Sequence, residues 1–174
     1  MKGLLSLVFC LWSFIFGFWS ISNVFAMGQV PSTQVKEGLI GSAAPDFTLG
    51  MTSGASKSLA QARQGKKAVL FLWATWCPHC HDGLLRMNED AEAMDKAGIK
   101  IILVDLGESK EEVKEYLLRN RLNWDSFVDA DNSLQEPYQL IGVPTLYFVD
   151  EKGIIRSIQH GFPSNYEELF SANK

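Results

Sequence analysis

The feature that most constrains the fold is a pair of cysteines, two residues apart, where an apolar run meets a helix-compatible segment. Cys77 and Cys80 are two of only three cysteines in the 174-residue chain. The apolar run 68–73 before them predicts a buried strand, and the segment 82–89 after them predicts a helix. A dithiol in such a turn can form and break a disulfide, so the sequence predicts thiol–disulfide exchange.

The spacing places Cys77 at the N-cap of that helix and Pro78 at its first position, where the missing N–H has no partner to lose. Cys80 then lies one turn further on, within reach of the Cys77 sulfur. The free N–H groups of the first turn and a protonated His79 favour the thiolate and lower the pKa of Cys77. We therefore expect Cys77 to attack, Cys80 to resolve, and Pro78 and His79 to tune the redox potential.

Three other interpretations of the cysteine pair stay open at this point. One is a static structural disulfide, and another is half of a zinc site, although the chain has no second cysteine pair and only three histidines. The third is covalent haem attachment, because residues 77–81 match the Cys-x-x-Cys-His signature. The preceding strand and the internal proline favour a redox turn. We predict no metal and no cofactor.

Four motifs, in order, carry a resemblance to a known family. They are Ala44-Pro45-Asp46-Phe47-Thr48-Leu49, Phe71-Leu72-Trp73-Ala74-Thr75-Trp76-Cys77, Gly142-Val143-Pro144-Thr145 and Phe148-Val149-Asp150-Glu151-Lys152-Gly153-Ile154-Ile155. Over residues 39–162 the chain resembles the thioredoxin superfamily, and within it the TlpA/ResA/DsbE-like extracytoplasmic oxidoreductases. The resemblance implies an α/β thioredoxin-like fold, a mixed central sheet with helices on both faces.

The same resemblance implies a substrate-binding region beside the dithiol. Pro144 would be cis and lie next to the Cys77 sulfur, and Val143 would present backbone groups to an extended client segment. Trp76 abuts the dithiol, and we expect it to shield the sulfurs or contact the substrate, with plain packing as the alternative. Trp73 is expected in the core.

The chain departs from the family at two acidic positions. Thioredoxins carry a buried acid six residues before the first cysteine, where this chain has Phe71. The TlpA-like group often has Glu three residues after the second cysteine, where this chain has Gly83. The Pro-His dipeptide also resembles that of DsbA-type oxidases. The scaffold thus resembles that of reductants, whereas the active-site residues favour an oxidant or isomerase.

Hydrophobic periodicity predicts alternating strands and helices through the rest of the chain. The expected strands are Val69–Trp73, Ile99–Asp105, Phe127–Val128, Thr145–Val149 and Ile154–Gln159. The expected helices are Pro78–Ala97, closed by Gly98, then Ser109–Arg121, begun by a capping box of Ser109 with Glu112, and finally Ser133–Leu140 and Ser164–Ala172. A parallel βαβ unit followed by an antiparallel hairpin predicts a mixed sheet. Asp105, Asp129 and Asp131 lie at strand ends or in turns, and we assign them no catalytic role.

The N-terminal segment indicates export. After Lys2 no charged residue occurs before Lys36, and residues 3–21 are mostly apolar. We expect residues 1–26 to be either a signal peptide, cleaved after the small residue Ala26, or an uncleaved membrane anchor. Residues 27–38 read as a linker, and 39–174 as the thioredoxin-like domain. Both outcomes predict a periplasmic or extracytoplasmic location for the dithiol.

The predicted function is an extracytoplasmic oxidoreductase that exchanges disulfides with protein dithiols and is recycled by a membrane or periplasmic redox partner. Disulfide formation and cytochrome c maturation are the two candidate processes. The net charge of −4 argues against a nucleic-acid partner. A copper-binding chaperone using Cys77, Cys80 and His81 is the main alternative. A peroxiredoxin is another, although Ala74 replaces the Thr expected three residues before the reactive cysteine.

Overall fold

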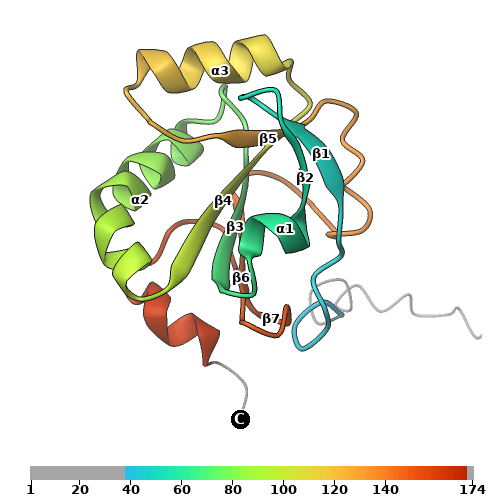
Figure 1. Ribbon diagram of the computed structural model, residues 1–174, viewed down its shortest axis with the longest axis vertical. Coiled ribbons are helices and arrows are strands. Elements are labelled where there is room, and N and C mark those ends of the chain that lie inside the picture. Colours follow the sequence, from blue (N-terminus) through green and yellow to red (C-terminus); the bar gives the residue numbers. More distant parts are fainter. Residues whose placement is uncertain (1–37, 172–174) are drawn as a thin grey trace, which may run out of the picture. The chain divides into compact units, whose positions relative to one another are not determined.

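The computed structural model describes residues 38–171, so the predicted leader 1–26 and nearly all of the predicted linker lie outside the described residues. Seven strands form one sheet in the order β2-β1-β5-β4-β3-β6-β7 (Figure 1). They are β1 (Thr48–Met51), β2 (Ser56–Ser58), β3 (Lys67–Trp73), β4 (Ile99–Leu106), β5 (Ser126–Asp129), β6 (Thr145–Val149) and β7 (Ile155–Gln159). The β3–β4 and β4–β5 pairs are parallel and the others antiparallel, which confirms the predicted mixed sheet.

Alternating side chains of the central strand β3 build the two faces of the core. The described part of the chain has four helical elements: α1 (Leu59–Arg63), α2 (Pro78–Lys96), α3 (Lys110–Arg119) and the 3-10 helix η1 (Tyr166–Phe170). Val69, Phe71 and Trp73 pack with α2, α3 and η1 on one face. Ala68, Leu70 and Leu72 pack on the other face with α1 and the turns of residues 132–140. Helices therefore cover both faces, as predicted, although irregular chain covers much of the second.

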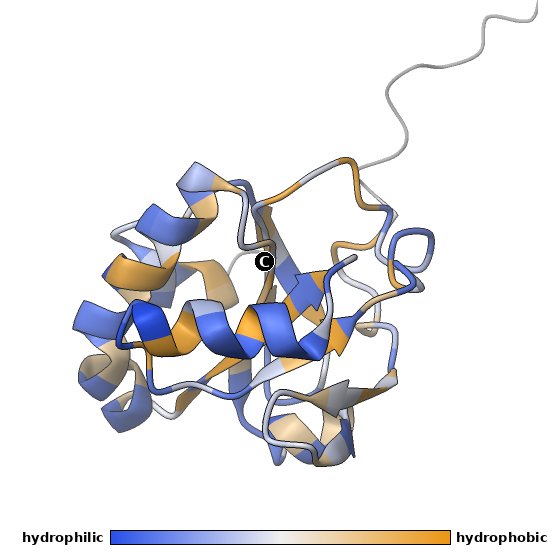
Figure 2. Cartoon of the chain, turned by 90° about the horizontal axis from the view of Figure 1, so that it is seen from above, coloured by the Kyte–Doolittle hydropathy of each residue, from blue (hydrophilic) through white to orange (hydrophobic). Residues whose placement is uncertain are grey.

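The caps of the two long helices are those that the sequence predicts. Cys77 is the N-cap of α2 with Pro78 at the first position, and Ser109 with Glu112 forms a capping box at the start of α3. Gly98 closes α2 with a φ of 72°, a conformation that glycine adopts without steric cost. Hydrophilic and apolar residues alternate along these helices (Figure 2), and the apolar residues Leu84, Met87, Val113 and Leu117 are buried in the core. Within residues 38–171 no helix has the length and apolar character to cross a membrane.

The predicted helix Ser133–Leu140 is wrong, because the structure has consecutive turns there. Pro137 lies inside the segment and has no N–H for a helical ladder. Asp129 instead binds the backbone N–H groups of Ser133 and Leu134 at 2.9 Å each. Gln139 then takes a left-handed φ of 49°, which ends any helical course.

Two other parts of the fold differ from expectation. The predicted helix Ser164–Ala172 is a short 3-10 helix, η1, and no side chain caps its N-terminus. The strands β1 and β2 and the helix α1 were not predicted as elements. Each of them has only three to five residues, too few for a hydrophobic period to show.

Candidate active site

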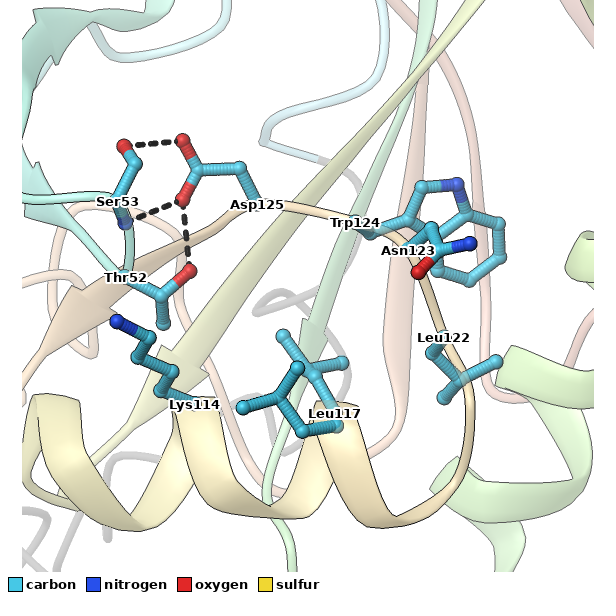
Figure 3. Close-up of a pocket in the computed structure, with 9 residues that line it drawn as sticks. Thr52, Ser53, Lys114, Leu117, Leu122, Asn123, Trp124 and Asp125 are labelled. Carbon is cyan, nitrogen blue, oxygen red and sulfur yellow. Dashed lines mark hydrogen bonds between the residues drawn. The ribbon is translucent and has the colours of Figure 1, made fainter.

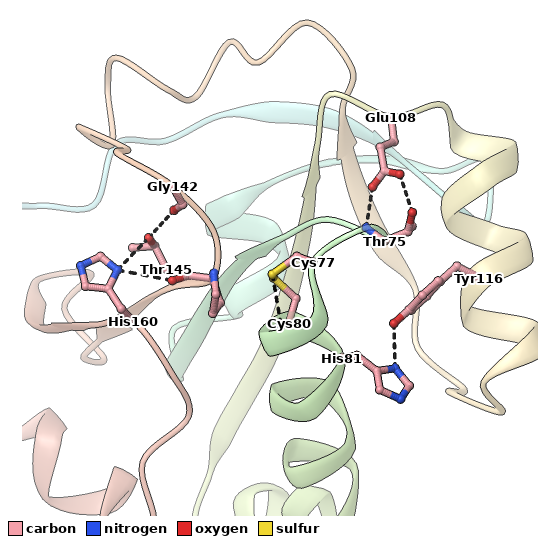
Figure 4. The surroundings of a disulfide bond; sticks show 10 residues. Thr75, Cys77, Cys80, His81, Glu108, Tyr116, Gly142, Thr145 and His160 are labelled. Atoms are coloured by element: carbon pink, nitrogen blue, oxygen red, sulfur yellow. Dashed lines mark hydrogen bonds between the residues drawn. A yellow bond between two sulfur atoms is a disulfide. The ribbon is translucent and has the colours of Figure 1, made fainter.

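The dithiol lies where the buried strand β3 ends and α2 begins. Cys77 and Cys80 form a disulfide with their Cα atoms 5.2 Å apart (Figure 4). The Cys77 sulfur accepts a hydrogen bond from the backbone N–H of Cys80 at 3.2 Å. The helix N-terminus therefore directs an N–H at the atom that becomes negatively charged on reduction. Cys77 is 4% exposed and Cys80 0%, so Cys77 is the outer of the two sulfurs. His79 is exposed.

The Val143–Pro144 peptide bond is cis, as the resemblance implied. This bond precedes β6, which pairs with β3 so that Thr145 lies opposite Leu72. The proline loop therefore lies at the same sheet edge as the dithiol turn, and Val143 packs against the cluster that contains both cysteines. Among the described residues, no hydrogen bond engages the backbone N–H or C=O of Val143.

Side chains from two elements hold the proline loop (Figure 4). The Thr145 hydroxyl donates to the carbonyl of Gly142 at 2.7 Å. His160 Nδ1 lies 3.3 Å from both the Pro144 carbonyl oxygen and Thr145 Oγ1. The loop is thus held by Thr145 of β6 and by His160, which directly follows β7, whereas the Val143 backbone has no hydrogen-bond partner within residues 38–171.

Beside the dithiol lies a shallow, uncharged groove of about 190 Å³. Its lining residues are Trp76, Leu106, Asn132, Gln135, Leu140, Ile141, Gly142 and Val143. Trp76 is 70% exposed and Ile141 76% exposed, so two large apolar side chains face solvent at its rim. This exposure excludes plain core packing for Trp76, whereas Trp73 is fully buried as predicted.

A larger groove, of about 390 Å³, lies between α3 and the turn after β1 (Figure 3). Asp125 in this groove accepts hydrogen bonds from the Thr52 hydroxyl at 2.7 Å and from the Ser53 backbone N–H at 2.9 Å. Although burial opposes ionisation, these donors hold the pKa of Asp125 below its usual value. The groove shares no lining residue with the dithiol turn or the proline loop, so it is not part of the dithiol site.

The two departures from the family motifs form one structural feature. Phe71 is fully buried under the first turns of α2. A Cβ atom on Gly83 would lie 3.2 Å from Phe71 Cζ, which is tighter than ordinary contact. The phenyl ring therefore occupies the space beside Gly83, and an acid at residue 83 would need the ring to move.

A pair of acids lies behind the dithiol turn, and sequence reasoning assigned it no role. Glu108 accepts the backbone N–H of Thr75 at 2.6 Å and the Thr75 hydroxyl at 2.5 Å. Asp105 lies next to Trp73 in the parallel β3–β4 register and is fully buried. Burial, and next the nearby Glu108, raise the pKa of Asp105 to about 9. The available signal was an acid at the end of an apolar strand that neighbours the active-site strand.

His81 does not lie with the sulfurs. Its Nδ1 atom is 2.8 Å from the hydroxyl of Tyr116 on α3, and burial raises the pKa of that tyrosine. Within residues 38–171, no group of three or more His, Cys, Asp or Glu side chains is arranged to hold a metal ion.

Comparison with known proteins decides the family. The model of the AhpC/TSA family matches residues 40–158, more than half of the chain. The chain belongs to the AhpC/TSA family. It is 32% identical to the thiol-disulfide oxidoreductase ResA of Geobacillus thermodenitrificans over 122 residues, 70% of each chain. It is 33% identical to the thioredoxin-like protein YneN of Bacillus subtilis, over 70% of this chain and 71% of YneN.

Solved structures support the same assignment. A putative thiol:disulfide interchange protein DsbE from Chlorobium tepidum superposes with a TM-score of 0.67 at 25% identity, over 76% of this chain and 94% of that one. StoA from Bacillus subtilis superposes with a TM-score of 0.59 at 25% identity, over 75% and 98%. Thioredoxin-like fold and thiol–disulfide oxidoreductase activity are therefore established for this family member, and the names of these relatives do not favour a copper chaperone.

Proposed function

We propose that this protein is an extracytoplasmic oxidoreductase that exchanges disulfides with extended segments of client proteins. The observation that carries the proposal is the Cys77–Cys80 disulfide at the start of α2, at the same sheet edge as a cis-proline loop whose Val143 backbone has no hydrogen-bond partner among the described residues. The apolar stretch in residues 3–21 supports the location outside the cytoplasm. A signal peptide or a membrane anchor would both serve there, and the recycling partner would be a membrane or periplasmic redox protein.

The exchange proceeds through a mixed disulfide. The Cys77 thiolate attacks one sulfur of a client disulfide, which forms a Cys77–client bond and expels the other client sulfur as a thiolate. The Cys80 thiolate then attacks the Cys77 sulfur, so the client leaves as a dithiol and the Cys77–Cys80 disulfide forms. The same steps in reverse oxidise a client dithiol. Cys77 attacks because it is the outer sulfur and accepts an N–H from the helix N-terminus.

The groove beside the dithiol and the proline loop bind the client. The unpaired N–H and C=O of Val143 offer a client strand two main-chain hydrogen bonds, and Pro144 has no N–H that would compete. Trp76 and Ile141 add exposed apolar surface beside these bonds. The groove has no charged lining residue, so an uncharged, apolar side chain near the client cysteine fits best.

The proposal predicts different fates for two cysteine variants. Cys80→Ala keeps the attacking thiol and lacks the resolving one, so mixed disulfides with clients accumulate in cells. Cys77→Ser removes the nucleophile and lowers activity by roughly 10³-fold or more. Non-reducing electrophoresis with mass spectrometry identifies the trapped species.

The matched control is the double variant Cys77→Ser with Cys80→Ala, which traps nothing. Clients trapped by Cys77→Ser instead of Cys80→Ala would reverse the assignment of roles. Trapped clients that are all cytoplasmic would contradict the proposed location.

A further inference from the structure

Asp105 is a buried acid that the exchange reaction described above does not use. It lies near the carboxyl end of β4, beside Trp73 of β3, and none of its surface reaches solvent. Neither carboxyl oxygen has a hydrogen-bond partner of regular geometry among the described residues. An ionised carboxylate in such a place would lack both water and a well-aligned donor, so the neutral acid is the stable form.

Asp105 connects to the dithiol through Glu108, three residues further along the chain. Glu108 uses one carboxylate oxygen for the Thr75 N–H and the other for the Thr75 hydroxyl. Thr75 lies two residues before Cys77, in the short segment between β3 and the start of α2. Glu108 therefore fixes the segment that places the Cys77 sulfur at the helix N-terminus.

The two acids differ in their access to water. Glu108 is half-buried, so its side chain can turn toward solvent, whereas Asp105 cannot. A negative charge on Asp105 would repel the nearby carboxylate of Glu108 in a medium of low dielectric constant. Glu108 is the partner that would move, and its movement would release Thr75.

We propose that Asp105 is a positioning residue for the reaction at Cys77: its neutral carboxyl keeps Glu108 bound to Thr75, and loss of its proton releases Thr75 and alters the reactivity of the Cys77 thiolate. The proton goes to solvent, and no other group is consumed. The proposal rests on thiol–disulfide exchange at Cys77 and on neither the client nor the direction of electron flow.

The surrounding titratable groups define what a test must separate. On α3, Glu112 is held by its capping box with Ser109, which lowers the pKa of Glu112, and Tyr116 has a raised pKa because of burial. On α2, Asp82 lies close enough to act on Tyr116, and His81 contacts the Tyr116 hydroxyl. The β3 and β5 register partners of Asp105, Trp73 and Val128, carry no charge. His81 and the two thiols are therefore the groups to control for.

The test is the alkylation rate of Cys77 by iodoacetamide in the reduced full-length protein, followed from about pH 6 to about pH 10 by mass spectrometry. The wild type should show the step of thiolate formation and a further, alkaline step. Asp105→Asn, an uncharged side chain of the same shape, should keep the first step and lose the second. His81→Gln is the matched control and should keep both steps. A contribution from Cys80 ionisation does not depend on residue 105, so it would persist in Asp105→Asn.

If Asp105→Asn fails to fold, Glu108→Gln gives the second test, because it also removes the repulsion and should abolish the alkaline step. Profiles of Asp105→Asn and wild type that superimpose at every pH would overturn the proposal, and so would loss of the alkaline step in His81→Gln. The assay needs no client, so its failure is distinguishable from failure of the proposed function, which the trapping experiment addresses.

Discussion

The β3–α2 turn and the β4–α3 turn, each taken with the strand end before it, are neighbours that differ in how they accommodate negative charge. Both follow parallel strands, end at the same sheet edge, and lead into a helix whose first turn is capped. In the β3–α2 turn, the Cys77 sulfur accepts an N–H from the helix. At the end of β4, just before the β4–α3 turn, Asp105 is fully buried without a hydrogen-bond partner of regular geometry among the described residues, and burial keeps it neutral. The negative charge of a thiolate is therefore stabilised where an N–H points at the sulfur, whereas a buried carboxyl without a well-aligned donor stays protonated.

Two hydrogen bonds between the turns connect the buried acid to the reactive cysteine. Glu108 from the second turn binds Thr75 in the first at 2.5 and 2.6 Å. The position of the reactive sulfur thus depends on a carboxylate that lies beside a neutral acid. Neither acid occupies the two positions where the family carries one, because Phe71 and Gly83 stand there.

The largest effect is expected when the ionisable carboxyl of Asp105 is replaced, because this removes the difference in charge between the two turns. Its pKa is raised from 3.8 to about 9 in the folded protein, so its contribution to stability is present at low pH and is lost as the pH rises toward 9. The free energy of unfolding of wild type should therefore fall between about pH 5 and about pH 9 by more than that of Asp105→Asn. The difference between the two proteins should exceed about 1.4 kcal/mol. Urea unfolding at both pH values measures the difference. Equal pH dependence in the two proteins would contradict a neutral Asp105.

The next largest effect is expected at the bond between the turns. Glu108→Ala removes two charge-assisted hydrogen bonds to Thr75 and should lower kcat/KM for a disulfide substrate about tenfold. Glu112→Ala is the matched control, since it loses only the α3 capping box and should lower stability by about 1 kcal/mol with unchanged kcat/KM. Similar losses of kcat/KM in both variants would show that α3 stability, and not the Thr75 contact, matters.

The smallest effect concerns the space under α2. Gly83→Ala places a Cβ 3.2 Å from Phe71 Cζ, and this contact should cost about 1 kcal/mol and so offset the gain of similar size that alanine has over glycine in a helix. In a Phe71→Leu background the same change should cost less, because the ring is gone. Thermal or urea unfolding of the four proteins forms a double-mutant cycle. Additive effects would show that residues 71 and 83 do not share this space.

The first turn could be predicted from the sequence because its signals are local. An apolar run, an N-cap, a proline at the first helical position and a closing glycine lie within one stretch of chain, and the structure confirms all of them. The cis Pro144 followed from the family motif and is also confirmed. By contrast, turns replace the predicted helix 133–140, because Asp129 and Pro137 override its apparent periodicity.

The second turn could not be predicted because its meaning depends on contacts between distant residues. Asp105 looks like an ordinary strand end until the β3–β4 register places it beside Trp73. The pairing of Glu108 with Thr75 joins residues 33 positions apart. The strands β1 and β2 are too short for a period; they pair with each other, and β1 also pairs with β5.

The measurement that tests the central claim most directly is the reduction potential of the Cys77–Cys80 disulfide in a glutathione buffer. The Cys80 N–H points at the Cys77 sulfur, and we expect this contact, the sequence neighbour His79 and the lack of a carboxylate at Phe71 to stabilise the thiolate, and hence the reduced protein. The potential should be more oxidising than the −270 mV or so of thioredoxin, and His79→Pro should shift it toward more reducing values. A wild-type potential at or below that of thioredoxin would contradict the claim that this turn favours the thiolate.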